Sequence, residues 1–171
     1  IFQFCGYNYV AAGNIGNAIC LASQTATGYI IELSSYQLEI TKFLKLDLAL
    51  CLGVTPDHQD RYPNFQSYAK AKMRILHHLQ PNIAVLSQDN EITKGWLNSN
   101  MHNILFSGRQ ISNNSIAALN NTLYDNIFDN CVYEIPSNKQ LIGTHNNENI
   151  AACYAAAKAF GLQGQKIIAA I

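Results

Sequence analysis

The sequence has no excess of charge of either sign. Its 171 residues include 11 basic and 11 acidic side chains, so the formal net charge is zero. A neutral chain creates no overall field that attracts nucleic acid or an acidic membrane surface. Long apolar runs are also missing, because none approaches the roughly 18 residues of a membrane-spanning helix. We expect a cytoplasmic protein, and a monomer, that binds neither nucleic acid nor membranes.

Two familiar motifs are missing. The five cysteines stand at positions 5, 20, 51, 131 and 153, and none of them forms a CxxC pair. Four lie in apolar or alanine-rich runs, which favours core thiols in a reducing cytosol over disulfides. The chain also contains no Gly-Lys dipeptide, so it lacks the usual GxxxxGK[ST] loop that cradles nucleotide phosphates.

Nearly half of the residues, 49%, are apolar, which is enough for one domain with its own core. The continuous apolar run at residues 28–33 predicts a buried strand, and residues 46–54 predict a second one. A helix is expected between them, with Ser34 and Gln37 forming a capping box. Strand, helix and strand across residues 28–54 indicate a βαβ unit and therefore a parallel sheet.

The rest of the chain continues this pattern. Residues 83–87 and 102–108 predict further strands, and residues 89–99 predict a short helix that Asp89 caps. Residues 110–142 are rich in asparagine and alternate apolar with polar side chains, which predicts a small antiparallel sheet beside the parallel one, with hairpin turns at Asn120-Asn121 and Asp129-Asn130. The predicted class is α/β: a mostly parallel sheet flanked by helices, with a small antiparallel sheet.

Chemically active side chains gather around the ends of the first two strands. Glu32 ends the first strand, while Asp57, His58 and Asp60 follow the second. Ligands bind at the carboxyl ends of parallel strands, so we expect Glu32 and His58 to approach each other there. Carboxylate and imidazole together suit Mg²⁺, Mn²⁺ or Zn²⁺. The residues alone therefore predict a metal or nucleotide site in an α/β domain.

A lysine lies on the apolar face of the helix that follows this loop. On a helical wheel Lys72 falls near the middle of that face, where a lysine needs a partner. Lys70 and Arg74 point the other way. The stem of Lys72 could instead pack on the core while its charged end reaches water. The apolar face consists of Phe65, Tyr68, Ala69, Met73, Leu76 and Leu79.

An alanine-rich helix is expected at residues 147–160, with Gly161 ending it. The preceding stretch offers His145, Asn146 and Asn149. Asparagine often caps a helix, so capping is one role for these residues. Polar side chains beside the free N–H groups of a helix start also suit a nucleotide.

Four motifs follow one another along the chain: GNIG at 13–16, IELSSYQLE at 31–39, VTPDHQDRYPNFQSYAKAK at 54–72 and GTHNNENIAA at 143–152. Together they resemble the Mur ligase family. The ELSSYQLE form is similar to the branch that adds D-glutamate to UDP-N-acetylmuramoyl-L-alanine. The resemblance implies an ATP-dependent, amide-bond-forming ligase of peptidoglycan precursor synthesis that works through an acyl phosphate. The chain departs from the family at Gly53, where asparagine is usual.

The resemblance also implies roles for single residues. Glu32 would help to hold one Mg²⁺ near the γ-phosphate of ATP. His58 would hold a second Mg²⁺, and Lys72 would be a carbamylated lysine that serves the same ion. Both His58 and Lys72 would therefore be catalytic.

Four further residues are implied to bind the substrates. Asn14 and Ser34 would face the muramoyl substrate. Asn146 and Asn149 would meet the adenine nucleotide. Glutamine at position 37 completes the expected capping box, so Ser34 also has a structural role open to it.

The resemblance implies that residues 1–171 are the central ATP-binding domain of a three-domain enzyme, a P-loop-type mononucleotide-binding domain incomplete at both ends. We expect the phosphate loop to precede Ile1 and the last domain to follow the helix at 147–160. The chain by itself is then expected to be inactive and to bind ATP weakly.

Other functions stay open. The nearest alternative is another Mur ligase or a ligase like folylpolyglutamate synthase, although ELSSYQLE favours D-glutamate. A metallohydrolase with His58 and a carbamylated lysine is a second alternative. Such enzymes often have an HxH motif, whereas this chain has only the adjacent pair His77 and His78. A binding module without catalytic activity is the third.

Overall fold

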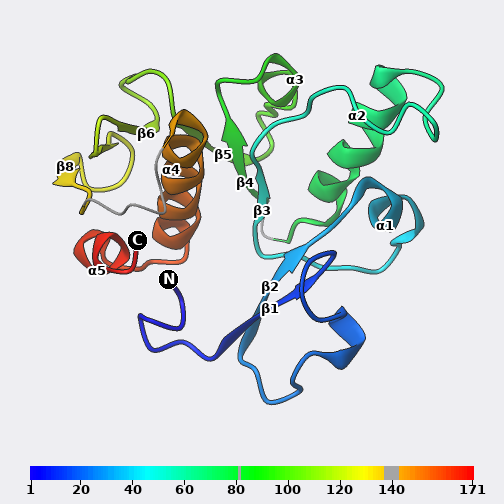
Figure 1. The fold of residues 1–171 in the computed structure, drawn as a ribbon, viewed down its shortest axis with the longest axis horizontal. Helices are drawn as coiled ribbons and strands as arrows, with labels where there is room; N and C mark the ends of the chain where they lie inside the picture. Colours follow the sequence, from blue (N-terminus) through cyan, green and yellow to red (C-terminus); the bar gives the residue numbers. More distant parts are fainter. Residues whose placement is uncertain (81, 137–142) are drawn as a thin grey trace.

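The computed structural model of the chain describes residues 1–80, 82–136 and 143–171. Its main body has three layers, with helix α4 (Thr144–Ala159) on one face of a central sheet and helix α2 (Phe65–Met73) on the other (Figure 1). In the part of the chain that the structure describes, no helix is both long and apolar enough to cross a bilayer.

The central sheet has six strands in the order β3-β4-β5-β6-β7-β8. The first four run parallel, and the last two are antiparallel to their neighbours. The predicted α/β class with a mostly parallel sheet is confirmed. The antiparallel strands continue this sheet instead of lying beside it, because β6 pairs with β5 and β7. The strands are β3 (Ala49–Cys51), β4 (Ile83–Ser87), β5 (His102–Ser107), β6 (Ile116–Leu119), β7 (Thr122–Asp125) and β8 (Cys131–Glu134).

The hairpin between β6 and β7 turns at Asn120 and Asn121, as the sequence predicts. Both residues have positive φ, 49° and 59°. A two-residue hairpin turn needs this left-handed backbone, which asparagine adopts more readily than most residues. The end of the predicted antiparallel segment, residues 137–142, lies outside the described residues.

The central strands are buried on both faces. In β4, Ala84 and Leu86 pack with the helix α2 side of the core, whereas Val85 packs with the α4 side. All three side chains have 0% exposure. Alternate side chains of a strand point to opposite faces, so a strand between two helical layers must be apolar throughout.

Helix α4 packs closely on the sheet because many of its buried side chains are alanines. Ala151 and Ala155 have no exposed surface. The helix begins at Thr144, three residues before the predicted 147, because the polar residues there form its first turn instead of a preceding loop. Gly161 follows its end with φ +81°, as expected for a residue after a helix C-terminus. A last helix, α5 (Gly164–Ala169), packs beside it.

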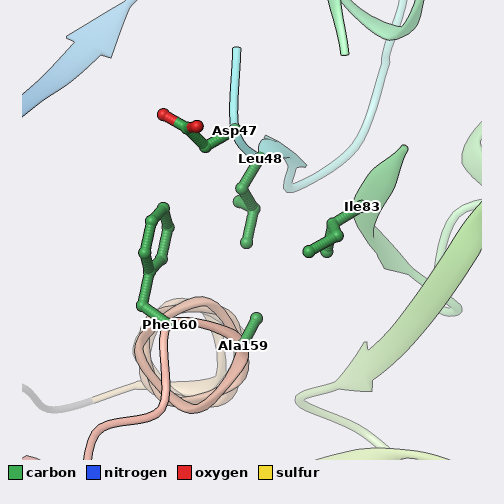
Figure 2. A pocket seen from close by; sticks show the side chains of 5 residues that line it. All are labelled: Asp47, Leu48, Ile83, Ala159 and Phe160. Carbon is green, nitrogen blue, oxygen red and sulfur yellow. The ribbon is translucent and has the colours of Figure 1, made fainter. Parts of the chain in front are cut away.

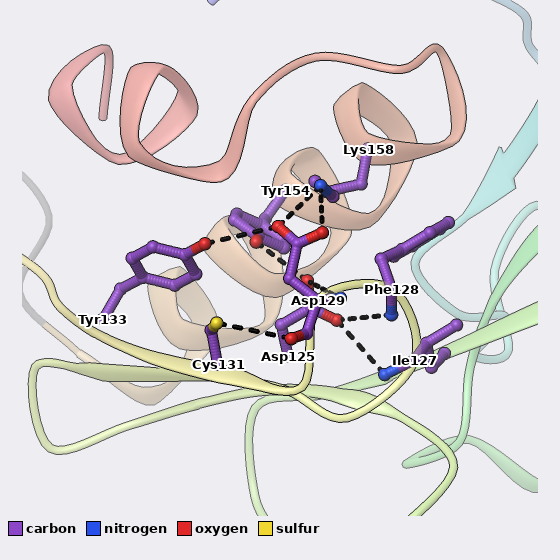
Figure 3. A network of polar contacts seen from close by, with 8 residues as sticks. All are labelled: Asp125, Ile127, Phe128, Asp129, Cys131, Tyr133, Tyr154 and Lys158. Atoms are coloured by element: carbon purple, nitrogen blue, oxygen red, sulfur yellow. Dashed lines mark hydrogen bonds and ion pairs between the residues drawn. The ribbon is translucent and has the colours of Figure 1, made fainter.

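A polar network joins α4 to the antiparallel strands (Figure 3). The carboxylate of Asp125, fully buried, accepts hydrogen bonds from the Phe128 N–H at 2.8 Å and the Tyr154 hydroxyl at 2.9 Å. Burial, together with hydrogen bonds to the side chains of Tyr133 and Asp125, raises the pKa of Tyr154 well above its usual range. Lys158 also donates to Asp129 at 2.7 Å. Satisfied polar groups of this kind hold the helix in one register on the sheet.

A second, smaller sheet contains β1 (Tyr9–Gly13) and β2 (Gly28–Glu32), which run parallel. The prediction of a buried strand at 28–33 is wrong in one respect, because Tyr29 and Ile30 are 43% and 49% exposed. Among the described residues, β2 pairs with β1 and β3 pairs with β4. The βαβ unit expected across residues 28–54 therefore does not form one sheet.

Helix α1 (Ser35–Ile40) has the predicted capping box: the Ser34 hydroxyl accepts the Gln37 N–H, and the Gln37 side chain accepts the Ser34 N–H. The second predicted strand, 46–54, is shorter than expected. Outside β3, Leu46 makes only an isolated bridge to Leu79.

The short helix α3 (Glu91–Lys94) begins one residue later than predicted. Asn90 caps it by accepting the Ile92 and Thr93 N–H groups. Asp89, the predicted cap, instead accepts the Gly108 N–H at 2.8 Å. The described residues also include two 3₁₀ helices, η1 (Ile19–Leu21) and η2 (Arg74–His78).

The expectation of core thiols is also wrong. All five cysteines are free, but Cys20, Cys131 and Cys153 are exposed, and Cys5 and Cys51 are half-buried. A thiol in an apolar run is buried only when another element covers that face.

Candidate functional site

The carboxyl ends of β1 and β2 bring three of the predicted site residues together. Asn14 follows β1 and donates through its side chain to the Glu32 carboxylate at 3.1 Å, while its N–H donates to the Glu32 carbonyl at 2.9 Å. Ser34 stands two residues on, at the start of α1. Gly13 permits this approach, because a Cβ there would overlap the Glu32 carbonyl. We call this group, Asn14, Glu32 and Ser34, the amide–carboxylate group.

The loop that carries His58 begins at a fixed point. Val54 is buried, and its carbonyl accepts a hydrogen bond from the Asn90 side chain at 3.0 Å. The same Asn90 side chain lies 3.4 Å from where a Cβ on Gly53 would stand. Gly53 is the position where the sequence departs from the pattern it resembles, and the side chain of Asn90 lies next to it.

His58 itself adopts a left-handed backbone, with φ 51°. The Asp57 carboxylate accepts the His58 N–H at 2.7 Å, and the His58 carbonyl accepts the N–H groups of Arg61 and Tyr62 at 3.0 Å. The imidazole keeps 41% of its side-chain surface exposed. The loop thus holds an accessible imidazole on a backbone that is hydrogen-bonded on both sides.

Lys72 and His58 contact the same aromatic ring. The Lys72 Nζ lies 5.4 Å from the centre of the Tyr68 ring, and the His58 ring lies 5.6 Å from it. Lys72 is half-buried, between the buried Ala71 and the half-buried Met73 of the same helix. Lys72 therefore lies half-buried beside Tyr68 of the apolar face, on the same ring that His58 contacts.

The electrostatics around Cys51 locate Lys72 more closely. Burial raises the pKa of the Cys51 thiol; a hydrogen bond with the Gly53 backbone and the charge of the Lys72 ammonium oppose that rise, and the Glu148 carboxylate adds to it. Because Cys51 ends β3, both charges lie near the carboxyl edge of the central sheet.

The start of α4 reaches the same edge. The Ser87 hydroxyl, at the end of β4, donates to the Glu148 carboxylate at 2.6 Å. Gly108, just after β5, lies so close that an added Cβ would be 2.5 Å from the Glu148 N atom. Asn146 is half-buried and Asn149 is exposed in these first turns. Helix α4 therefore presents both predicted nucleotide residues at the carboxyl edge.

The sequence analysis did not identify Ser87, Gly108 and Glu148. The signal that pointed to Glu32 was available for two of them, because Ser87 and Gly108 each stand where an apolar strand ends. No comparable signal exists for Glu148, whose partner is 61 residues away.

The predicted residues form separate neighbourhoods. The amide–carboxylate group lies at the end of the small sheet, and His58 with Lys72 lies around Tyr68. Over residues 1–80, 82–136 and 143–171, no three His, Cys, Asp or Glu side chains gather closely enough to hold a metal ion. Glu32 was expected beside His58 because the strands that precede them, β2 and β3, were predicted to be neighbours in one sheet. In the structure β2 and β3 belong to different sheets, so this reason does not hold.

A cavity of about 300 Å³ lies away from these residues (Figure 2). It is lined by Asp47, Leu48, Ile83, Ala159 and Phe160. Ile83 begins β4 and Ala159 ends α4, so this cavity is at the amino edge of the sheet. The chemistry predicted above concerns the opposite edge.

Known proteins resemble this chain in sequence. The model of the Mur ligase middle domain matches residues 13–157. The chain belongs to the Mur ligase family. A relative from Rickettsia bellii, a UDP-N-acetylmuramoylalanine–D-glutamate ligase, is 37% identical over 172 residues, covering 97% of this chain and 38% of the relative. A ligase of the same name from Paramagnetospirillum magneticum is 36% identical, covering 100% of this chain and 38% of the relative.

Solved Mur ligase structures share the fold. A UDP-N-acetylmuramoyl-L-alanyl-D-glutamate–2,6-diaminopimelate ligase has a TM-score of 0.71 at 17% identity, covering 95% of this chain and 45% of that chain. A UDP-N-acetylmuramoylalanyl-D-glutamyl-2,6-diaminopimelate–D-alanyl-D-alanyl ligase from Acinetobacter baumannii has a TM-score of 0.64 at 15% identity, covering 98% and 46%. This Mur ligase domain therefore spans less than half the length of these proteins.

Proposed function

We propose that the chain is the central ATP-binding domain of a ligase that joins D-glutamate to UDP-N-acetylmuramoyl-L-alanine. The observation that carries this proposal is the 37% identity, over 97% of the chain, to a relative named for that reaction. The relative is much longer, so the remaining domains and the phosphate loop would belong to the full-length protein. Because the substrates are nucleotide-activated, we place the reaction in the cytoplasm, with a monomeric enzyme.

The proposed reaction has two steps. The carboxylate of the muramoyl substrate takes the γ-phosphoryl group of ATP and becomes an acyl phosphate. The amine of D-glutamate then attacks the carbonyl carbon, loses a proton and expels inorganic phosphate. Both steps depend mainly on positioning and on electrostatic stabilisation of the phosphoryl charge.

The residues at hand suit two Mg²⁺ ions under one condition. Glu32 offers carboxylate oxygens and His58 an imidazole nitrogen, which are ligands that divalent ions accept. An ammonium at Lys72 would repel a cation, so this lysine fits only as a carbamate, whose oxygens suit Mg²⁺. Bound Mg²⁺ would offset charge on the transferring phosphoryl group.

The two neighbourhoods suit two different tasks. The amide–carboxylate group combines a metal ligand, Glu32, with Asn14 and Ser34, which we propose face the muramoyl substrate. His58 and Lys72, which both contact the Tyr68 ring, would hold the second ion. Asn146 and Asn149 would meet the adenine nucleotide at the start of α4, because the N-terminus of a helix favours anionic and polar ligands.

An amino-acid specificity assay tests the proposal. Full-length protein is incubated with ATP, Mg²⁺ and UDP-N-acetylmuramoyl-L-alanine, together with D-glutamate, L-glutamate, L-lysine or diaminopimelate. We expect phosphate release and a product heavier by one glutamyl residue with D-glutamate alone. Product with another amino acid, or with a folate and L-glutamate, would instead identify a different ligase of the same superfamily.

A further inference from the structure

The His58 imidazole and three tyrosine rings form a closed cycle of aromatic contacts. The Tyr36 and His58 rings lie 5.2 Å apart, and those of His58 and Tyr68 5.6 Å. The rings of Tyr62 and Tyr68 are 5.3 Å apart, and those of Tyr36 and Tyr62 6.2 Å. We call these four residues the aromatic box. Most of its pairs are tilted or edge-to-face, the arrangements that aromatic rings prefer.

The aromatic box joins three segments of the chain. Tyr36 comes from α1, Tyr68 from α2, and His58 and Tyr62 from the loop between β3 and α2. Its inner walls are rigid, because Tyr62 and Tyr68 are only 6% and 5% exposed. Tyr36 and the imidazole form the open side. The imidazole therefore contacts the buried Tyr68 ring on one side and is exposed to solvent on the other.

Charged contacts brace the open side. Arg61 lies over the Tyr36 ring, 5.4 Å from its centre, and donates to the Glu39 carboxylate at 2.9 Å. On the same helices, the Arg74 side chain donates to the Leu38 carbonyl at 2.9 Å. These contacts fix α1 to the His58 loop and to α2, and with them the distance between the box walls.

Tyr62 contributes its ring and not its hydroxyl. In the described part of the chain, the Tyr62 hydroxyl is buried without a hydrogen-bond partner. A buried hydroxyl without a partner destabilises a protein, so a phenylalanine in its place is expected to be neutral or stabilising. The ring contacts on both sides are what position 62 supplies.

We propose that Tyr62 and Tyr68 are positioning residues for the His58 imidazole before any metal binds: Tyr68 contacts the imidazole directly, and Tyr62 acts through its contacts with Tyr36 and Tyr68. The inference rests on the proposed role of His58 as a metal ligand. A ligand that is already ordered loses less conformational entropy when an ion binds.

Removing one inner wall tests this role. In full-length protein, Tyr62→Leu is expected to raise the Mg²⁺ concentration for half-maximal activity by about threefold to tenfold, the factor that corresponds to one aromatic pair. Tyr62→Phe keeps the ring and should match the wild-type value. If Tyr62→Phe is impaired as much as Tyr62→Leu, the hydroxyl matters and the proposal is overturned.

A second readout does not depend on activity. In metal-free protein, the imidazole proton resonance of His58 is assigned by comparison with His58→Gln. The surrounding rings should shift it away from the position of a free histidine. Tyr62→Leu and Tyr68→Leu should move it back, whereas Tyr62→Phe should not. An unchanged resonance in both leucine variants contradicts the proposal.

Tyr133→Leu is the matched control. This tyrosine is also at least half-buried and packs on an aromatic ring, with its ring 5.8 Å from that of Tyr154. Its loss should lower the melting temperature without changing the His58 resonance or the Mg²⁺ dependence. If the wild-type protein adds no D-glutamate, the proposed function fails, while the resonance still decides whether the box orders His58.

Discussion

Residues 13–72 and residues 83–171 bury their apolar side chains very differently. Among the described residues, every apolar side chain with 0% exposure lies between residues 84 and 167. In residues 13–72, by contrast, Leu21 is 77% exposed and Phe43 is 92% exposed. Yet this first part carries most of the candidate site, and the second part carries most of the core. Chemistry and stability are therefore largely assigned to different parts of the domain.

The difference has a topological cause. The central strands have a helical layer on each face, so both sets of alternating side chains are covered (Figure 1). The small sheet has two strands, and neither face of β2 is fully covered within the described residues. Predictions that compare the two parts can test how far this separation holds.

The largest effect is expected at Lys72, on activity alone. In full-length protein, Lys72→Ala should reduce turnover to background, because the proposed carbamate ligand is lost. The free energy of unfolding should change by less than about 1 kcal/mol, the size of one partly exposed cation–π contact with Tyr68. Steady-state turnover and thermal melting measure the two effects.

Lys70→Ala is the control for this variant, because Lys70 is exposed on the same helix. It should keep both turnover and stability. A short carboxylic acid added to Lys72→Ala should restore part of the activity by supplying the missing oxygens. Wild-type turnover in Lys72→Ala would contradict both the metal role and the division between site and core.

A pair of apolar truncations tests the core side of the comparison. Phe106→Ala should destabilise the protein by about 3–5 kcal/mol, because Phe106 has no exposed surface and truncation leaves a cavity. Ile30→Ala should cost about 1 kcal/mol or less, since Ile30 is 49% exposed. Hydrogen exchange of the β5 and β2 peptides in full-length protein measures both. Equal losses would show that β2 is as well packed as β5.

An effect smaller than that of Phe106→Ala is expected at the contact between β5 and α4. Gly108→Ala should destabilise by about 1–3 kcal/mol, because its Cβ would lie 2.5 Å from the Glu148 N atom. The start of α4 must shift, so the KM for ATP should rise while the Mg²⁺ dependence stays. Gly95→Ala, whose Cβ would meet nothing closer than 3.3 Å, is the control. An unchanged KM would separate Asn146 and Asn149 from nucleotide binding.

Sequence patterns predicted the elements whose signals are local. The strand at residues 83–87, the Ser34–Gln37 capping box and the turn at Asn120 and Asn121 all appear as expected. Lys72 was also placed correctly, because helical periodicity depends only on neighbours along the chain. The Ser87–Glu148 contact was not predictable in this way, since it joins residues that only the fold brings together.

By itself, the sequence determined which segments become strands and helices, which residues cap or end them, and which family the four motifs resemble. Backbone hydrogen bonding and side-chain periodicity act over a few residues, so these features can be read locally. The tertiary structure alone decided that β2 pairs with β1 and not with β3. It also decided that three tyrosines from separate segments form a cycle of ring contacts with His58. Burial and ring contacts depend on partners distant in sequence, and no local pattern specifies which partner arrives.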